Sequence, residues 1–153
     1  MRTDQVECIV FRQQNKNYEF LLLKRIPKKG GFWQPVSGGI ETEDKSIIDS
    51  AYRELKEETN ISKNEIITVF ENVHYFEMNK HYLTGAPIPI RKEYVFGFEV
   101  KPNFEINLGK NIYQEHSGAC WVCFEEALKL LKWENNKDGL KKLNKLLNKK
   151  NKN

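Results

Sequence analysis

Three glutamates on one predicted helix are the residues best placed to do chemistry. Glu57 and Glu58 follow Glu54 by three and four positions, so all three carboxylates can point toward one side of the helix. Carboxylates this close repel one another unless a cation offsets their charge. A hard divalent cation such as Mg²⁺ takes such oxygen ligands, together with phosphate oxygens and water. Taken alone, the same spacing also fits an ordinary charged helix face.

A pair of glycines upstream of this helix favours a functional site over a plain charged face. Gly38 and Gly39 follow the apolar segment Phe32–Val36 and precede the helix. Because glycine has no side chain, the backbone there can approach a ligand closely. Arg53 stands directly before Glu54, so the helix also carries a cation beside its carboxylates.

The segment from Gly39 to Ile61 resembles the Nudix box. That pattern is a Gly, five residues, a Glu, seven residues, and then Arg-Glu-apolar-x-Glu-Glu-x-Gly-apolar. The chain has the expected residue at Gly39, Arg53, Glu54, Leu55, Glu57, Glu58 and Ile61. The resemblance implies an α/β fold, an α/β/α sandwich with a mixed central sheet, and a loop–helix–loop metal site. It also implies an enzyme that hydrolyses a diphosphate linkage.

Two positions depart from the Nudix box. Asn60 replaces the family Gly, and Asn is the usual second choice for the left-handed residue that ends a helix. Lys45 replaces the family Glu. If that Glu holds Arg53 in place, then Asp44, Glu43 or Glu41 must substitute, or the site is looser.

The resemblance also assigns roles by position. Glu57 and Glu58 are expected metal ligands, Glu54 is a ligand or supports one, and the Gly39 carbonyl can complete the coordination. Arg53 is expected to orient the carboxylates, so the catalytic set includes Arg53, Glu54 and Glu58. The expected cofactor is Mg²⁺, with Mn²⁺ as a substitute, which would offset transition-state charge and activate a water.

A further carboxylate is expected from outside the box. Gln114-Glu115-His116 resembles a Glu-His stretch in dihydroneopterin triphosphate pyrophosphohydrolases, where the Glu belongs to the metal and base site. Glu115 is therefore a candidate ligand or general base, with an exposed loop Glu as the alternative. We expect a structural role for His116. The stretches Phe32–Gln34, Tyr82–Pro87 and Trp133–Asn135 resemble the same subgroup.

Several residues outside the box are candidates for substrate contacts. Lys24 and Arg25 end a predicted strand and can hold phosphates. Arg91 is a candidate phosphate clamp or merely flanks a strand. Aromatic rings can stack on a purine or pterin ring, although each is more often a core residue. The candidates for stacking are Trp33, Tyr82 and Trp133.

The elements that must position these residues alternate between strands and helices. Strands are predicted at Val6–Phe11, Phe20–Leu23, Ile66–Phe76, Glu93–Val100 and Cys120–Phe124, and Phe32–Val36 is expected to be extended. Helices are predicted at Ser46–Thr59, Glu125–Leu131 and Lys137–Leu147, and Met78–Pro89 is predicted to be a long loop. With no repeat or linker, residues 1–153 are predicted to form one domain.

Composition limits the classes of partner. Residues 141–153 carry six Lys and no acid, which leaves 19 basic residues against 21 acidic ones elsewhere. This basic C-terminal segment, about 137–153, is expected to be the solvated face of a helix rather than a nucleic-acid or membrane contact. No apolar run could span a bilayer, so a cytoplasmic location is expected. Cys8, Cys120 and Cys123 are expected to be structural.

Three functions remain open at this level. The leading hypothesis is Mg²⁺-dependent pyrophosphohydrolysis of a (d)NTP or dihydroneopterin triphosphate, a small phosphate-ester substrate, to monophosphate and pyrophosphate. The second is hydrolysis of a dinucleoside polyphosphate or an RNA 5′ end, which the basic segment would favour. The third is a non-catalytic nucleotide-sensing domain. The ring recognised and the oligomeric state, monomer or homodimer, are left open.

Overall fold

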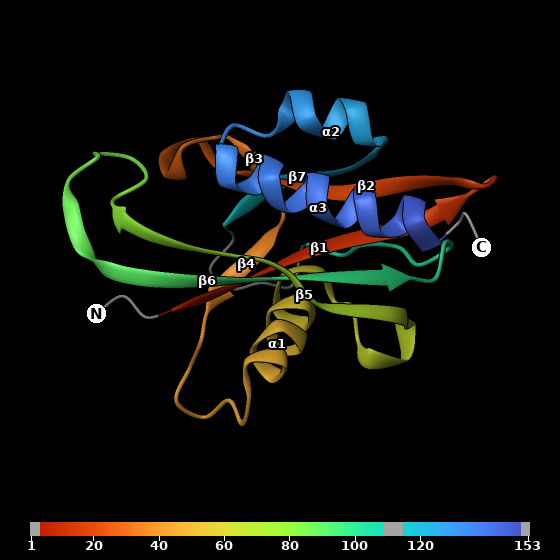
Figure 1. Cartoon of the computed structure of the whole chain (residues 1–153), viewed down its shortest axis with the longest axis horizontal. Coiled ribbons are helices and arrows are strands. Elements are labelled where there is room, and N and C mark those ends of the chain that lie inside the picture. Colours follow the sequence, from red (N-terminus) through yellow and green to blue (C-terminus); the bar gives the residue numbers. More distant parts are fainter. Residues whose placement is uncertain (1–3, 109–114, 151–153) are drawn as a thin grey trace.

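The computed structural model describes residues 4–108 and 115–150, which form a three-layered sandwich. A mixed sheet of seven strands lies in the middle of the described part (Figure 1). Helix α1 (Ile47–Thr59) covers one face, and helices α2 (Phe124–Leu130) and α3 (Glu134–Lys150) cover the other. The predicted α/β/α sandwich is confirmed.

The sheet is built around two central strands that run parallel to each other, β1 and β6. Its order is β3-β2-β1-β6-β5, with β4 paired to β1 and β7 paired to β2, and all pairs other than β1–β6 are antiparallel. The strands are β1 (Gln5–Gln14), β2 (Asn17–Arg25), β3 (Trp33–Gln34), β4 (Val36–Gly39), β5 (Ile66–Lys80), β6 (Pro87–Val100) and β7 (His116–Val122). Two 3₁₀ turns, η1 (Pro27–Lys29) and η2 (Lys63–Glu65), complete the described elements.

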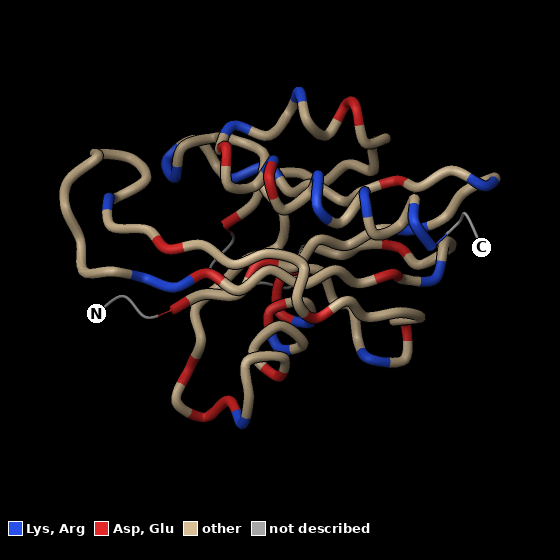
Figure 2. Tube along the Cα trace, viewed as in Figure 1, with Lys and Arg blue, Asp and Glu red and all other residues tan. Residues whose placement is uncertain are grey.

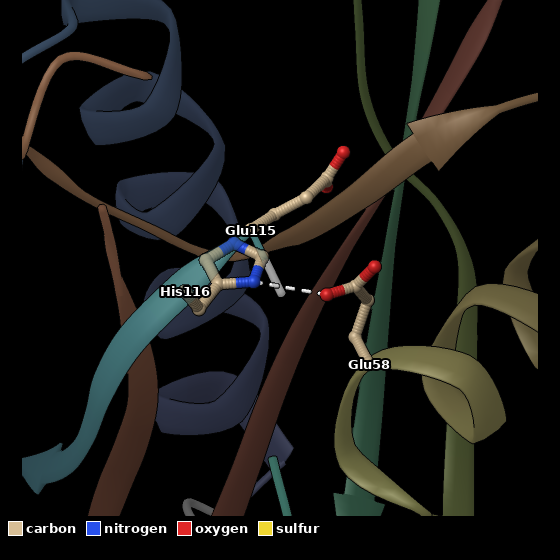
Figure 3. A group of neighbouring side chains, drawn as sticks. All are labelled: Glu58, Glu115 and His116. Carbon is tan, nitrogen blue, oxygen red and sulfur yellow. Dashed lines mark ion pairs between the residues drawn. The ribbon is translucent and has the colours of Figure 1, made fainter. Parts of the chain in front are cut away.

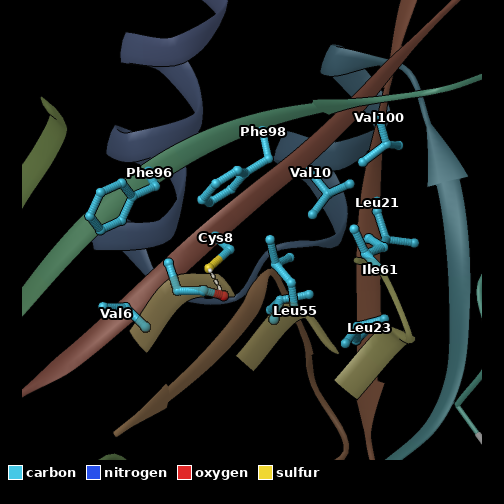
Figure 4. Packing of buried hydrophobic residues seen from close by; sticks show 12 residues of the cluster. Val6, Cys8, Val10, Leu21, Leu23, Leu55, Ile61, Phe96, Phe98 and Val100 are labelled. Atoms are coloured by element: carbon cyan, nitrogen blue, oxygen red, sulfur yellow. Dashed lines mark hydrogen bonds between the residues drawn. The ribbon is translucent and has the colours of Figure 1, made fainter. Parts of the chain in front are cut away.

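The side chains of β1 alternate between two hydrophobic cores. Val6, Cys8 and Val10 pack under α1 in the cluster of Figure 4, where the Cys8 thiol lies 3.8 Å from the Ala51 carbonyl. Alternate positions face α3, whose Leu140, Leu143 and Leu147 are buried with Ile9 and Phe11 of β1. Because strand side chains alternate, Glu7 shares the α3 face with these apolar residues.

Helix α1 begins and ends where the sequence predicts. The Ser46 hydroxyl accepts a hydrogen bond from the Asp49 backbone N–H and caps the first turn. At the other end, Asn60 has φ 64° in the left-handed region, which stops the helix as expected for its Gly-like position. These two caps fix the length and direction of the helix that carries the three glutamates.

The prediction of a long loop at Met78–Pro89 is wrong. Strands β5 and β6 form a long antiparallel hairpin, and only residues 81–86 connect them. Pro87 and Pro89 are tolerated in β6 because its pairing with β1 starts only at Glu93, which leaves one side of the strand free of ladder bonds there. The ladder between β5 and β6 has three register shifts, and β5 is an edge of the sheet.

The C-terminal part also differs in detail from the prediction. Strand β7 starts at His116 and ends at Val122, and Phe124 already belongs to α2. Cys8 is a core residue, but Cys123 is exposed before α2, so a core role does not extend to it. The lysines of α3 from Lys141 to Lys150 are exposed, as expected, and Figure 2 shows where they recur along the helix. No helix within residues 4–108 and 115–150 has the length and apolarity needed to cross a bilayer.

Candidate active site

A cleft of ≈ 1040 Å³ opens between α1, the β5–β6 hairpin and the start of α3. It collects most of the site residues predicted from the sequence. Those that line it are Arg25, Gly39, Glu54, Glu57, Glu58, Tyr82, Arg91, Glu115 and Trp133. Residues from seven separate segments therefore face one volume of a size suited to a nucleotide-like ligand.

Arg53 is the centre of a hydrogen-bonded cluster at the α1 side of the cleft. Its guanidinium donates to the Gly39 carbonyl at 2.7 Å and to Glu54 Oε1 at 2.9 Å. It also forms a two-pronged contact with Asp44, from Nε to Oδ1 at 3.0 Å and from Nη2 to Oδ2 at 2.9 Å. Glu57 Oε2 lies 3.3 Å from Arg53 Nη1. Arg53 thus connects the glycine turn, the following loop and the helix. These partners also raise the pKa of the Arg53 guanidinium above its usual value.

Asp44 holds Arg53 at the position where Lys45 departs from the family pattern. The hydrogen bonds from Arg53, followed by those from the Ser50 hydroxyl and the Glu41 backbone N–H, hold the pKa of Asp44 well below its usual range. Glu41 contributes only a longer ion pair of 3.5 Å, and Lys45 is exposed. Of the three proposed substitutes, Asp44 therefore makes the strong contact.

Gly38 makes room for the Glu54 carboxylate. A Cβ atom on Gly38 would overlap the Glu54 carboxylate, so any larger residue would displace that carboxylate. Glu54 is only 6% exposed, and its burial raises its pKa to about 8 against the opposing effect of Arg53. From the sequence, the glycine pair was expected to let the backbone approach a ligand, whereas the space at Gly38 is filled by a neighbouring carboxylate.

Glu58, Glu115 and His116 form a second group of neighbouring side chains at the cleft (Figure 3). One potential ligand atom from each lies within 4.8 Å of the others. His116 Nδ1 lies 2.9 Å from Glu58 Oε2, and its Nε2 lies 3.3 Å from the Gln34 amide nitrogen. With that amide as donor, Nε2 accepts and Nδ1–H donates to Glu58, so the buried imidazole orients the carboxylate.

Glu115 lies between Glu58 and two basic side chains of the cleft. Its carboxylate lies 3.2 Å from Lys29 Nζ and 3.9 Å from Arg25 Nη1. It reaches this place because β7 begins beside the end of β2, where the Ile26 N–H donates to the Glu115 carbonyl. The predicted extra carboxylate thus lies next to Glu58, with two cations behind it.

The donor set suits a hard divalent cation. Glu54, Glu57, Glu58 and Glu115 all turn toward the same cleft, so the available ligands are carboxylate oxygens. Mg²⁺ and Mn²⁺ favour such oxygen donors, whereas the His116 imidazole is already engaged with Glu58 and Gln34. The residues present therefore fit the expected cofactor.

The rim of the cleft carries an aromatic and cationic group. Arg25 Nη2 donates to the Tyr82 hydroxyl at 3.3 Å. The Phe32 ring makes edge-to-face contacts with Tyr82 at 5.8 Å and with Trp133 at 5.4 Å between centroids. These contacts hold Tyr82 of the 81–86 loop and Trp133, just before α3, against Phe32.

The structure does not place Lys24 and Trp33 at the cleft. They are register partners on β2 and β3, and the Lys24 ammonium lies 5.8 Å from the centre of the Trp33 ring. Lys24 points away because successive side chains of a strand face opposite sides, and its neighbour Arg25 faces the cleft. Trp33 packs against the core beneath α2 and α3.

The floor of the cleft holds the predicted Arg91 together with two buried carboxyl groups, Glu7 and Glu93, for which no role was predicted. Glu7 is 2% exposed and accepts a hydrogen bond of 3.0 Å from Asn136 Nδ2. Arg91 Nε lies 2.8 Å from Glu93 Oε2 as an ion pair, although the N–H is not aimed at the oxygen. The available signal was a charged residue within the apolar run Val6–Phe11.

Comparison with known proteins gives a consistent family assignment. The family described as NUDIX domain matches residues 1–143. The chain is 33% identical over 117 residues to the dihydroneopterin triphosphate diphosphatase of Haemophilus influenzae, covering 72% of this chain and 70% of that protein. It is 29% identical over 142 residues to an octanoyltransferase of Myxococcus xanthus. That match covers 93% of this chain and 36% of the octanoyltransferase. An RNA pyrophosphohydrolase of Pelagibacter ubique is 35% identical over 69 residues, covering 45% and 43%. The chain therefore spans less than half of the last two relatives.

Solved structures share the whole architecture. A crystal structure from Listeria monocytogenes, described as a NUDIX hydrolase, superimposes with a TM-score of 0.80 at 28% identity and covers 97% of both chains. An Ap4A hydrolase of C. elegans superimposes with a TM-score of 0.77 at 22% identity, covering 95% of this chain and 97% of that one. The second likeness concerns the fold alone.

Proposed function

The chain belongs to the NUDIX family, and on that premise we propose that it is a divalent-cation-dependent hydrolase of nucleoside-like triphosphates. Water attacks phosphorus, the bond to the bridging oxygen breaks, and the products are a monophosphate and pyrophosphate. The observation that carries the proposal is the carboxylate cluster ordered by Arg53 on one side of a cleft, with Arg25 and Lys29 on another. Such a site pairs a cation-binding wall with groups that attract phosphate.

Each side chain has a proposed part. Glu57, Glu58 and Glu115 hold the cation, with the Gly39 carbonyl directed by Arg53. When bound, Mg²⁺ would neutralise phosphate charge and acidify a water. Glu54 takes the proton on Oε2, since its Oε1 already accepts from Arg53.

The substrate candidates are a (d)NTP and dihydroneopterin triphosphate, the second being the substrate in the name of the Haemophilus influenzae relative. The test measures pyrophosphate and orthophosphate release with Mg²⁺ across the common (d)NTPs and dihydroneopterin triphosphate. Pyrophosphate from at least one of them is expected, and no release with either Mg²⁺ or Mn²⁺ would overturn the proposal.

Two variants show whether the release belongs to this site. Glu58→Gln should abolish most turnover, whereas Glu126→Gln, which alters an exposed carboxylate on α2, should not. Cation binding has a separate readout, because Mg²⁺ should raise the melting temperature of the wild type but not that of Glu58→Gln. Glu115→Gln should lower turnover less than Glu58→Gln does.

A second candidate function is hydrolysis of an RNA 5′ end or a dinucleoside polyphosphate, which the basic face of α3 favours. Truncating that helix cannot test it, because Leu143 and Leu147 are core residues. The exposed Lys141, Lys145 and Lys149 can instead be changed together to Gln. A selective loss of activity on triphosphorylated RNA would support this function, and an equal rate on every substrate would dismiss the basic face.

A non-catalytic sensor is the third function considered. Its main support was Lys45, since a missing family Glu would leave Arg53 unsupported. Asp44 provides that support at 2.9–3.0 Å, so the argument for an impaired site loses its basis. We therefore retain catalysis as the proposed function.

A further inference from the structure

A buried carboxyl group lies in the floor of the cleft, outside the carboxylate cluster on α1. Glu7 occupies a β1 position whose neighbours on the same sheet face, Ile9 and Phe11, are core residues. Burying a carboxyl in such surroundings opposes folding unless its hydrogen-bonding capacity is used. An apolar residue would be the stable choice for packing alone, so the presence of Glu7 calls for a ligand.

The hydrogen-bonding capacity of Glu7 is only partly used within the described residues. Asn136 Nδ2 donates to Oε1, and that is the one hydrogen bond to this carboxyl among residues 4–108 and 115–150. Burial and the nearby Glu93 carboxylate raise the pKa of Glu7 to about 8. The surroundings of Glu7 therefore lack donors, and a ligand that supplies N–H groups would fit this need.

The walls above this floor suit a flat ring. Phe32 and Trp133 contact each other at the rim, and Phe76 and Met78 of β5 line the same cleft. Aromatic and thioether side chains pack well on the faces of heteroaromatic rings. A ring between these walls would direct its polar edge to the floor and its phosphates to the α1 side.

We propose that Glu7 and Asn136 form the ring-recognition subsite and select a ring that has an N–H beside an exocyclic amino group. This inference rests on the proposed function and names its substrate class. The 2-amino-4-oxo edge of a pterin and the matching edge of guanine carry this arrangement. In its ionised form, which two ring donors favour, the Glu7 carboxylate accepts from the ring N–H and the amino group, and the second N–H of Asn136 donates to the ring carbonyl.

Other common rings match this subsite less well. Adenine presents a ring nitrogen acceptor where the subsite offers a carboxylate acceptor, and uracil and thymine present one N–H without an adjacent amino group. A hydrogen bond to a charged group contributes about 1.5–3 kcal/mol, which corresponds to a preference of roughly 10- to 150-fold. The subsite should therefore discriminate by the 2-amino group in particular.

The experiment compares kcat/KM for GTP, ITP, ATP and dihydroneopterin triphosphate. GTP and ITP differ only in the 2-amino group, and we expect GTP to be preferred by about tenfold or more. Glu7→Gln should lower kcat/KM for the two amino-bearing substrates by roughly 10- to 100-fold and change the ATP value less than threefold. The matched control, Glu71→Gln, alters an exposed carboxylate on β5 and should change none of them. The values for GTP and dihydroneopterin triphosphate decide between guanine and pterin.

A second measurement separates this inference from the proposed function. Calorimetric titration of the wild type with GMP, IMP and AMP reports ring recognition even if no triphosphate is cleaved, and GMP is expected to bind most tightly. Equal binding of the three, or a preference for AMP, overturns the inference whatever the activity. If Glu7→Gln does not fold, Asn136→Ala replaces it, and unchanged GTP-to-ITP selectivity in a folded variant also overturns the inference.

Discussion

The cluster around Arg53 and the floor around Glu7 are both polar, yet they are built in opposite ways. Arg53 binds partners 1, 9 and 14 positions away, so one short segment contains the cluster and its neutralising cation. Glu7 and Asn136 are 129 positions apart, and no ion pair to Glu7 occurs in the described part of the chain. The carboxylates around Arg53 have their cationic partner without substrate, whereas Glu7 would receive further hydrogen-bond donors from a bound ligand.

This difference predicts a division of labour. Changes in the Arg53 cluster should lower the rate on every substrate by a similar factor. Changes in the floor should alter which substrate is used, with a smaller effect on the best attainable rate. The following predictions test this difference. A variant of the Arg53 cluster that changes selectivity, or a floor variant that lowers every rate equally, would contradict it.

The largest effect is expected for Glu58→Gln. Losing this carboxylate should lower kcat on the order of 10³-fold or more, because a cation ligand and the partner of His116 are both removed. The loss should be equal for GTP and ATP. Steady-state kinetics and circular dichroism check this, and near-normal turnover of the folded variant would refute the metal assignment.

Asp44→Ala should have the next largest effect. Arg53 would lose its two-pronged partner, and we expect kcat to fall by roughly 10- to 100-fold. The double variant Asp44→Ala/Lys45→Glu moves the carboxylate by one position to the place of the family pattern. Recovery of much of the lost rate would show that Asp44 acts by holding Arg53, and a double variant no better than the single one would contradict this.

Gly38→Ala should give a smaller but specific defect. The added methyl group must displace the Glu54 carboxylate, while the backbone strand pairing is kept, so kcat should fall by about tenfold with little loss of thermal stability. Kinetics and a melting curve measure the two effects. A large loss of stability with unchanged kcat would mean that Gly38 serves the fold instead.

The smallest effect concerns the stability of the floor as pH changes. The pKa of Glu7 is higher in the folded protein, at about 8, than its usual value of 4.5. The folded state thus binds the proton more tightly, so its stabilisation is full below pH 4.5 and is lost as pH rises through 8. Glu7→Gln removes this loss, and its melting temperature should gain a few degrees over the wild type between pH 5 and 9. A constant difference would contradict the prediction.

The sequence predicts the α1 side of the site much better than the floor. Caps, helix periodicity and the spacing of Arg53, Glu54 and Glu58 are local features, and the structure places these residues together. Which of Asp44, Glu43 and Glu41 replaces the family Glu as the partner of Arg53 depends on the loop conformation, which the sequence does not reveal. The floor depends on contacts between strands and the distant helix α3, which sequence spacing does not encode, so Glu7 and Asn136 were not identified. For the same reason, Lys24 was expected at the cleft, which its side chain does not reach.

Strand β5 has a consequence for crowded solutions. This strand forms an outer edge of the sheet over fifteen residues, and Ile67 and Tyr75 on it are 54% and 45% exposed. An exposed edge of this kind is a site where a strand of another chain can pair. The three register shifts interrupt the straight ladder that such growth requires, and Glu71, Glu77 and Lys80 place charges along the same strand. The irregular hairpin that frames the cleft therefore also protects the protein against edge-to-edge aggregation.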